Sequence, residues 1–315
     1  ETWPYSLAQA ERELAQAVAV LAPTETVHIN VLNADHGIHV RELLAEAGAV
    51  DNIRLHEIPT NDAWCRDHGA IFVGRPGELA ATVWGYNAWG GKYPPWDRDI
   101  QVGRRMAEVV GVPILAHDLI LEGGALDTDG RGTLLATASC LLNPNRNPGV
   151  AQTEFEAALQ RAFGVTQVHW LAAEVAGDDT DGHVDVTTRF VDPHTLVVAL
   201  ETNPQDVNYG SLQENFQQVN TLRDSDGRPY AVHALPMPSP LVRHGQRLPA
   251  GYANFYIGNQ VVLLPAYDDP QDQVAQQLLQ ELFPDRRVVS LDCRALVEGL
   301  GVFHCLTQQV PTIPN

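Results

Sequence analysis

Apolar residues repeat every three or four positions in six segments of the chain, a spacing typical of amphipathic helices. We expect helices over residues 7–22, 37–48, 100–110, 154–163, 212–219 and 271–283. Several ends carry capping signals. Ser6, Thr153, Ser211 and Asp269 are expected to cap helix N-termini, and Gly164 is expected to end the helix that precedes it.

Short segments rich in Val, Ile, Leu and aromatic residues lie between these helices and predict β-strands. They are residues 27–32, 52–58, 70–74, 78–84, 133–138, 166–171, 195–200, 230–235 and 287–291, and a Gly-Asn turn predicts a hairpin over 256–264. The order strand, strand, helix, strand recurs without a linker rich in Ser or Gly. Adjacent strands without a crossover helix, and the absence of a GxGxxG segment, argue against a Rossmann fold.

Five polar segments with nearby glycines recur along the chain at intervals of about 50 to 70 residues. They are centred on Asp67, Glu122, His183, Asn254 and Cys305. This spacing suggests five similar units around a shared centre, with each unit contributing one polar segment.

Composition narrows the class of ligand. The chain has 20 Lys and Arg against 39 Asp and Glu, a formal net charge of -19. Nucleic acids and anionic membranes require basic surface, so we expect neither as a partner and favour cationic small molecules. No apolar run approaches the roughly 18 residues of a membrane span. Four scattered cysteines suit a reducing compartment, and we expect a cytoplasmic protein.

The segment over residues 178–185 packs four aspartates around one histidine. If His183 and Asp185 lie on an emerging strand, their side chains point to the same face and can share a pocket. A solvated acidic turn is the alternative for such a sequence. A histidine two positions before an aspartate favours a site.

Two earlier segments supply further candidate groups. Glu122 precedes two glycines, which would let the backbone approach a ligand closely, although a strand-ending bend is the alternative. Trp64, Arg66 and Asp67 together offer an aromatic wall, a cation and a carboxylate. The alternative for this second segment is a buried Arg66–Asp67 ion pair beneath a core tryptophan.

Cys305 is the candidate nucleophile, because it lies between His304 and a polar segment, and a nucleophilic cysteine commonly uses a histidine distant in sequence. We expect the other cysteines to be small buried apolar residues; these are Cys65, Cys140 and Cys293. Metal chemistry is the main competing hypothesis, since residues 181–185 resemble the Asp/His clusters of binuclear manganese hydrolases. The remaining histidines form no second cluster of that kind.

Five segments in order resemble the agmatine deiminase family, also called agmatine iminohydrolases, of the guanidine-modifying superfamily. They are WCRDHG, LEGGALDTDGRGTLLATASCLLNPNRNP, DDTDGHVD, NFYIGNQVVLLPAYDD and HCLTQQ, and they span about residues 60 to 310. The resemblance implies the pentein fold, a five-bladed α/β propeller of strand-strand-helix-strand units that forms one catalytic domain over residues 1–315. It also implies that no metal or organic cofactor is needed.

The resemblance further implies roles at matching positions. Cys305 would be the nucleophile and His183 the general acid and base. Glu122 would contact both the guanidinium and the histidine, and Asp67 and Asp185 would anchor the guanidinium.

The outer pocket would have to accept the amine at the far end of agmatine. Asp179 or Asp181 is expected to bind this amine, and Trp64 is expected to pack against the methylene chain, with core packing as its alternative.

The function implied is hydrolysis of agmatine to N-carbamoylputrescine and ammonia through a covalent cysteine intermediate, in polyamine biosynthesis. One alternative is deimination of peptidyl-arginine or another guanidino compound. A second is a metal-dependent hydrolysis of a guanidino compound. A noncatalytic sensor would not need Cys305 and His183 together. The expected partner is a cationic guanidino molecule, and a homodimer is compatible with these observations.

Overall fold

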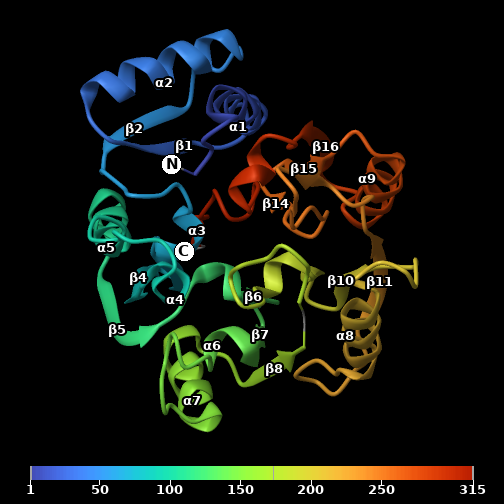
Figure 1. Ribbon diagram of the computed structural model, residues 1–315. Coiled ribbons are helices and arrows are strands. Elements are labelled where there is room, and N and C mark those ends of the chain that lie inside the picture. The colour runs from blue at the N-terminus through green and yellow to red at the C-terminus, as the bar shows by residue number, and fades with distance from the viewer. Residues whose placement is uncertain (1, 173, 314–315) are drawn as a thin grey trace.

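Five small sheets, each with a helix on its outer side, lie around a common centre in the computed structural model (Figure 1). The structure describes residues 2–172 and 174–313. The single domain expected over 1–315 thus includes residues 1, 173 and 314–315, which lie outside the described residues.

Four of the sheets share one topology, in which the first strand pairs antiparallel with the second and the second pairs parallel with the third. Their strands are β3 (Ile71–Arg75), β4 (Glu78–Gly85) and β5 (Ile114–Ile120); β6 (Leu126–Thr128), β7 (Thr133–Thr137) and β8 (Gln167–Leu171); β9 (Thr188–Asp192), β10 (Thr195–Leu200) and β11 (Ala231–Pro236); and β14 (Tyr256–Ile257), β15 (Val261–Ala266) and β16 (Arg287–Asp292). The helices between second and third strands are α5 (Asp99–Val110), α7 (Gln152–Phe163), α8 (Tyr209–Thr221) and α9 (Pro270–Leu282). These units have the predicted strand-strand-helix-strand order.

The N-terminal unit departs from this order. Its sheet consists of β1 (Val27–Val31) and β2 (Ile53–Glu57), which are parallel and are joined by α2 (Ala34–Glu46). The helix α1 (Leu7–Leu21) precedes them, and a hairpin of β12 (Val242–Arg243) and β13 (Gln246–Arg247) lies between β11 and β14. Short helical turns complete the described elements: α3 (Cys65–His68), α4 (Ala88–Gly91), α6 (Ala138–Leu141), η1 (Gly123–Ala125), η2 (Val184–Val186) and η3 (Leu296–Gly299).

Two of the predicted N-caps, Thr153 and Ser211, are wrong, and Ser6 stands at the predicted N-cap position of α1 without capping it through its side chain. Ser6 Oγ donates to Glu298 at 2.7 Å and makes no capping hydrogen bond. Ser211 Oγ donates to the carbonyl of Glu174, within a helix that begins two residues earlier. The helix expected to be capped by Thr153 begins at Gln152.

The remaining two helix-end predictions are confirmed. Asp269 accepts from the amide of Gln271 and forms a capping box with Asp272 at the start of α9. Gly164 adopts φ 67°, the left-handed conformation that ends α7 and that glycine adopts without steric cost. None of the described helices combines the length and the apolar character that crossing a bilayer requires.

The first strand of each complete sheet starts directly after one of the polar segments. Asp67 precedes β3, Glu122 precedes β6, Asp185 precedes β9 and Asn254 precedes β14. Figure 1 shows β6 and β14 on the inner side of their units, with α5, α7, α8 and α9 outside. The fold therefore brings the polar segments to the centre at the strands' starting ends.

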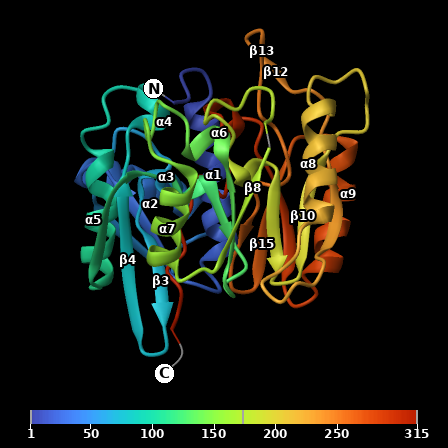
Figure 2. The same ribbon diagram turned by 90° about the horizontal axis from the view of Figure 1, so that it is seen from below.

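The N-terminal helix closes the ring against the last unit. The Glu13 carboxylate accepts the amides of Ala295 and Leu296 at 3.3 and 2.9 Å, and Trp3 Nε1 donates to the Leu296 carbonyl at 2.8 Å. Figure 2 shows the five units from the side, with the β3–β4 hairpin extending from one end. The chain from η3 then runs to Cys305, so this closure helps to position the candidate nucleophile.

Candidate active site

The predicted catalytic side chains meet around Gly124. A Cβ atom placed on this glycine would lie 2.7 Å from His183 Nδ1, 2.8 Å from Asp67 Oδ1 and 3.0 Å from Asp185 Oδ2. Cys305 Sγ lies 3.7 Å from Asp185 Oδ2. The structure thus gathers side chains that are up to 238 residues apart in the chain around a position that only a glycine can occupy.

These groups are buried. His183 and Asp185 are both 0% exposed and Cys305 is 7% exposed, which excludes a solvated acidic turn. Among residues 2–172 and 174–313, neither ring nitrogen of His183 nor Oδ1 of Asp185 has a hydrogen-bond partner. Buried polar atoms are costly when unpaired, so their concentration here points to a polar ligand.

Asp67 is held by two donors from neighbouring elements. Its Oδ1 accepts the amide of Gly124 at 2.9 Å, and its Oδ2 accepts Trp89 Nε1 at 3.0 Å. Arg66 instead donates through Nε to the carbonyl of His304 at 3.1 Å, so the alternative of a buried Arg66–Asp67 pair is wrong. Burial raises the pKa of Asp67, and the nearby Glu122 carboxylate adds to the rise.

Glu122 is fixed by an arginine that sequence analysis did not identify. Arg146 Nε donates to Glu122 Oε1 at 2.8 Å, and Nη2 donates to the carbonyl of Thr180 at 2.9 Å. Burial opposes ionisation, but His183 and Arg146 outweigh it and lower the pKa of Glu122. Glu122 is therefore a carboxylate, with its Oε2 at 3.7 Å from His183 Nε2.

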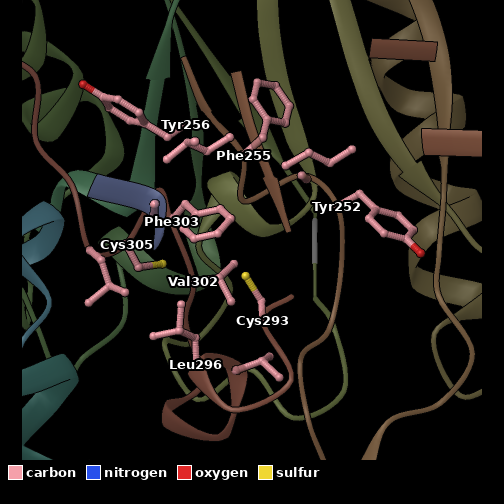
Figure 3. Packing of buried hydrophobic residues seen from close by; sticks show 14 of the residues in the cluster. Tyr252, Phe255, Tyr256, Cys293, Leu296, Val302, Phe303 and Cys305 are labelled. Atoms are coloured by element: carbon pink, nitrogen blue, oxygen red, sulfur yellow. The ribbon is translucent and has the colours of Figure 1, made fainter. Parts of the chain in front are cut away.

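Asn254 organises the segment that carries the candidate nucleophile. Its Nδ2 donates to Cys305 Sγ at 3.1 Å, and its Oδ1 accepts the amides of Val302 and Cys305, each at 3.3 Å. Figure 3 shows Val302 and Phe303 beside Cys305 in the apolar cluster that also contains Phe255. Burial raises the pKa of Cys305 well above its usual range, and the Asp185 and Asp67 carboxylates add to the rise. The empty site therefore holds a thiol.

His304 was missed as a contributor to the site. Its Nδ1 lies 2.6 Å from Asp185 Oδ2. Burial, together with the cations Arg189 and Arg66, lowers the pKa of His304 well below its usual range. A neutral His304 ring can therefore orient Asp185 while leaving Oδ1 of that carboxylate free.

The two central titratable groups have shifted pKa values. Burial opposes protonation of His183, but Asp67 and the neighbouring Cys140 and Glu122 outweigh it and raise the pKa of His183 well above its usual range. Burial raises the pKa of Asp185 to about 7, with His183 lowering it and Asp67 raising it. The site thus combines an imidazolium acid with a carboxyl group that titrates near neutrality.

The residues predicted for the outer pocket lie in two different settings. Asp181 pairs with Lys92 at 2.9 Å and also with Arg146, which speaks against its role as a free anchor for an amine. Asp179 accepts only the Tyr93 hydroxyl among side-chain donors of the described chain, so it keeps capacity for a cation. The Lys92–Asp181 and Tyr93–Asp179 contacts join the turn at 179–181 to the segment that carries Trp89.

Trp64 lies beside the nucleophile and within the core. Its ring centroid is 5.4 Å from that of Trp3, and its exposed fraction is 4%. A Cβ on Gly301 would lie 2.6 Å from Trp64 Cζ3 and 3.0 Å from Cys305 Cβ. The Trp64 ring and Cys305 therefore flank the same glycine, and contact of this ring with a substrate chain stays a prediction.

Across residues 2–172 and 174–313, the potential metal ligands that cluster in threes are Glu122, Cys140 and His183. This mixed set differs from the Asp/His ligands of a binuclear manganese centre. The Cys140 thiol lies 3.6 Å from Glu122 Oε2, so Cys140 is not merely the apolar residue we expected.

We expect Gly124→Ala to lower kcat/KM by at least about 100-fold, since displacement of catalytic groups by about 1 Å has effects of this size. The added methyl group would collide with His183, Asp67 and Asp185. Steady-state kinetics and thermal unfolding would measure the effect. Gly210→Ala is the matched control, because a Cβ at Gly210 meets nothing within 4 Å. Unchanged kinetics in Gly124→Ala would contradict the assigned centre.

A five-unit α/β fold whose centre combines a cysteine, a histidine and several carboxylates defines the guanidine-modifying class of pentein proteins. The fold alone is shared with an amidinotransferase from Microseira wollei, with a TM-score of 0.52 at 11% identity over 96% of this chain and 80% of that one. The chain belongs to the Porphyromonas-type peptidyl-arginine deiminase family, which it matches over residues 1–311.

The proteins similar to this chain include agmatine deiminases. The chain is 41% identical to an agmatine deiminase of Pseudomonas fluorescens over 286 residues, which are 83% of this chain and 78% of the relative. An agmatine deiminase structure from Enterococcus faecalis has a TM-score of 0.89 and 30% identity, covering 98% of this chain and 88% of that one. The resemblance to the agmatine deiminase family is therefore confirmed.

Proposed function

We propose that this protein hydrolyses agmatine to N-carbamoylputrescine and ammonia through a covalent intermediate on Cys305. The observation that carries this proposal is the convergence of Cys305, His183, Asp67 and Asp185 around Gly124. Agmatine is the substrate named for relatives up to 41% identical to this chain. The proposed reaction requires neither a metal nor an organic cofactor.

Binding of the guanidinium would satisfy the unpaired acceptors. Its planar array of N–H groups can donate to Asp67 and to Oδ1 of Asp185, an oxygen without a hydrogen-bond partner among the residues that the structure describes. A bound cation also favours the ionised forms of neighbouring acids. The substrate therefore lowers the pKa of Asp185 and Cys305, and the thiol proton leaves to water.

The first half-reaction breaks a carbon–nitrogen bond. The Cys305 thiolate attacks the central guanidinium carbon and forms a neutral tetrahedral adduct. The His183 imidazolium donates its proton to one amino group, which departs as ammonia and leaves a cationic thiouronium on the cysteine. Asn254, which donates to Sγ at 3.1 Å, stabilises the thiolate before attack.

The second half-reaction releases the ureido product. His183, now neutral, takes a proton from water as the water oxygen attacks the thiouronium carbon. The carbon–sulfur bond then breaks with its electron pair returning to Cys305, and loss of a proton gives the neutral ureido group. His183 is again an imidazolium, ready for another turnover.

Deimination of peptidyl-arginine is the second candidate, because the matched family carries that description. The burial of the catalytic groups argues against a peptide substrate. Cys305 is 7% exposed and Asp185 is 0% exposed, so an arginine side chain attached to a peptide backbone would need a wider entrance. Lys92 and Tyr93 both donate to Asp179, which ties the segment after Trp89 to the turn before His183.

Turnover of agmatine, free arginine and an Nα-acylated arginyl peptide distinguishes these substrates. Ammonia release gives the rates, and mass spectrometry identifies the ureido product. We expect kcat/KM for agmatine to exceed that for arginine by at least about 100-fold, because the Asp179 carboxylate expected to bind the amine would repel the α-carboxylate of arginine. If the arginyl peptide is turned over faster than agmatine, the proposal is wrong and the protein acts as a peptidyl-arginine deiminase.

A further inference from the structure

Glu122, Cys140 and His183 form a compact triangle of potential metal ligands on one side of the catalytic centre. Cys140 comes from α6, whereas Glu122 and His183 precede the turns η1 and η2. All three side chains are 0% exposed. One potential ligand atom of each residue lies within 4.8 Å of those of the other two.

The separations match those of a zinc site. Zinc bonds of about 2.0–2.3 Å in tetrahedral geometry place neighbouring ligand atoms roughly 3.3–3.8 Å apart. Glu122 Oε2 lies 3.6 Å from Cys140 Sγ and 3.7 Å from His183 Nε2. Two edges of the triangle therefore already have the required length, without a change of side-chain conformation.

Two further features prepare the triangle for a cation. His183 Nε2 is buried and has no hydrogen-bond partner in the described part of the chain, so a potential ligand atom 3.7 Å from Glu122 Oε2 is not committed elsewhere there. Arg146 Nε donates to the other oxygen of Glu122 at 2.8 Å, which fixes the carboxylate with Oε2 facing the thiol and the imidazole. Such outer contacts orient metal ligands in proteins.

We propose that Glu122, Cys140 and His183 bind a thiophilic divalent cation such as zinc, and that zinc bound there inhibits the enzyme. Binding replaces the thiol proton of Cys140 and the Nε2 proton of His183, both of which pass to water, and involves no redox change. Three protein ligands leave a fourth position for water. The inhibitory part rests on the proposed function, whereas the binding part does not.

Inhibition follows from the shared histidine. An imidazole that binds zinc through Nε2 cannot become the imidazolium that protonates the departing ammonia. Zinc also uses Oε2 of Glu122, which faces the same ring. Zinc bound at this site would therefore block general acid catalysis by His183. The thiol of Cys305, which lies 3.1 Å from Asn254 Nδ2, is not one of the metal ligands.

Cadmium titration tests binding independently of catalysis, because cadmium bound to thiolate has a characteristic ultraviolet absorption. In Cys305→Ser protein we expect one equivalent of cadmium to produce this absorption. Adding Cys140→Ala should abolish it. Cys293→Ala on the same Cys305→Ser background is the matched control, since Cys293 is equally buried outside the triangle, and it should retain the absorption. Persistence without Cys140, or its absence in Cys305→Ser protein, overturns the site.

Zinc inhibition of ammonia release from agmatine tests the consequence. We expect zinc to inhibit the wild-type protein, and we expect a chelator to restore the activity. The half-inhibitory concentration of zinc should be at least tenfold higher in Cys140→Ala and unchanged in Cys293→Ala. Equal inhibition of Cys140→Ala would refute control through this site. If the wild type does not turn over agmatine, the proposed function fails, and the cadmium titration still decides whether the triangle binds metal.

Discussion

Replacing Cys305 by serine is expected to lower kcat for ammonia release by at least about 10⁴-fold, while agmatine still binds with an affinity within about tenfold of wild type. A serine hydroxyl ionises far less readily than a thiol, so the attacking anion is lost. The groups proposed to hold the guanidinium, Asp67 and Asp185, remain in place. Calorimetric titration of agmatine and single-turnover ammonia assays measure the two quantities.

A suitable control for this prediction is Cys293→Ala. Cys293 belongs to the same apolar cluster as Cys305 but contacts none of the central acids among the described hydrogen bonds. Its replacement should leave kcat within a few-fold of wild type. Substantial turnover by Cys305→Ser would exclude nucleophilic catalysis by this cysteine.

Asp185→Asn is expected to lower kcat/KM by at least about 10³-fold although the side-chain volume barely changes. Removing one member of a buried charge pair typically costs roughly 2–5 kcal/mol. Oδ1 of Asp185 has no hydrogen-bond partner among the described residues, and Oδ2, which lies 3.7 Å from Cys305 Sγ, is already 2.6 Å from His304 Nδ1. An amide supplies neither the charge nor two acceptors. Steady-state kinetics of agmatine turnover would measure the loss.

Asp192→Asn serves as the control for Asp185→Asn, because it makes the same chemical change on the exposed end of β9. Its activity should match that of wild type. Wild-type activity in Asp185→Asn, or an equal loss in both variants, would show that the Asp185 charge does not anchor the substrate.

The pH dependence of kcat/KM provides an independent test of Asp185. Burial raises the pKa of this carboxyl group to about 7 in the free protein. The guanidinium requires the ionised form, so kcat/KM should rise more steeply with pH below pH 7 than above it, where only the thiol proton of Cys305 remains to be lost. Below pH 7 the carboxyl group is protonated and binding weakens. A change of slope near pH 7 that persists in Asp185→Asn would assign it to another group.

The helices and most outer strands were predictable because their apolar periodicity is local. β5, β6 and β9 were missed. In β5 (Ile114–Ile120) the polar pair His117 and Asp118 interrupts the apolar residues, and β6 (Leu126–Thr128) and β9 (Thr188–Asp192) each follow a polar segment at once. The cap predicted at Ser6 failed for a related reason. Its hydroxyl binds Glu298, a partner 292 residues away that no local pattern indicates.

The site was predictable to the extent that its residues lie in polar, glycine-flanked segments. Arg146 lies 24 residues from Glu122, and Trp89 lies 22 residues from Asp67, so their hydrogen bonds depend on how units pack. Sequence analysis identified His304 only as the residue before Cys305 and did not predict its contact with Asp185. An acidic centre with shifted pKa values requires supporting donors, and counting the unsatisfied carboxylates is the signal that could have prompted a search for them.

The placement of the reactive groups at the starting ends of inner strands separates two rates of evolutionary change. Substitutions at those ends disturb several sheets at once, whereas the segment around Lys92 and Tyr93 meets the turn at Asp179 outside these strands, where Lys92 donates to the main-chain carbonyl of Asp179 and Tyr93 to its carboxylate. Descendants of one ancestor could therefore diverge in the molecules they accept while inheriting the same chemistry.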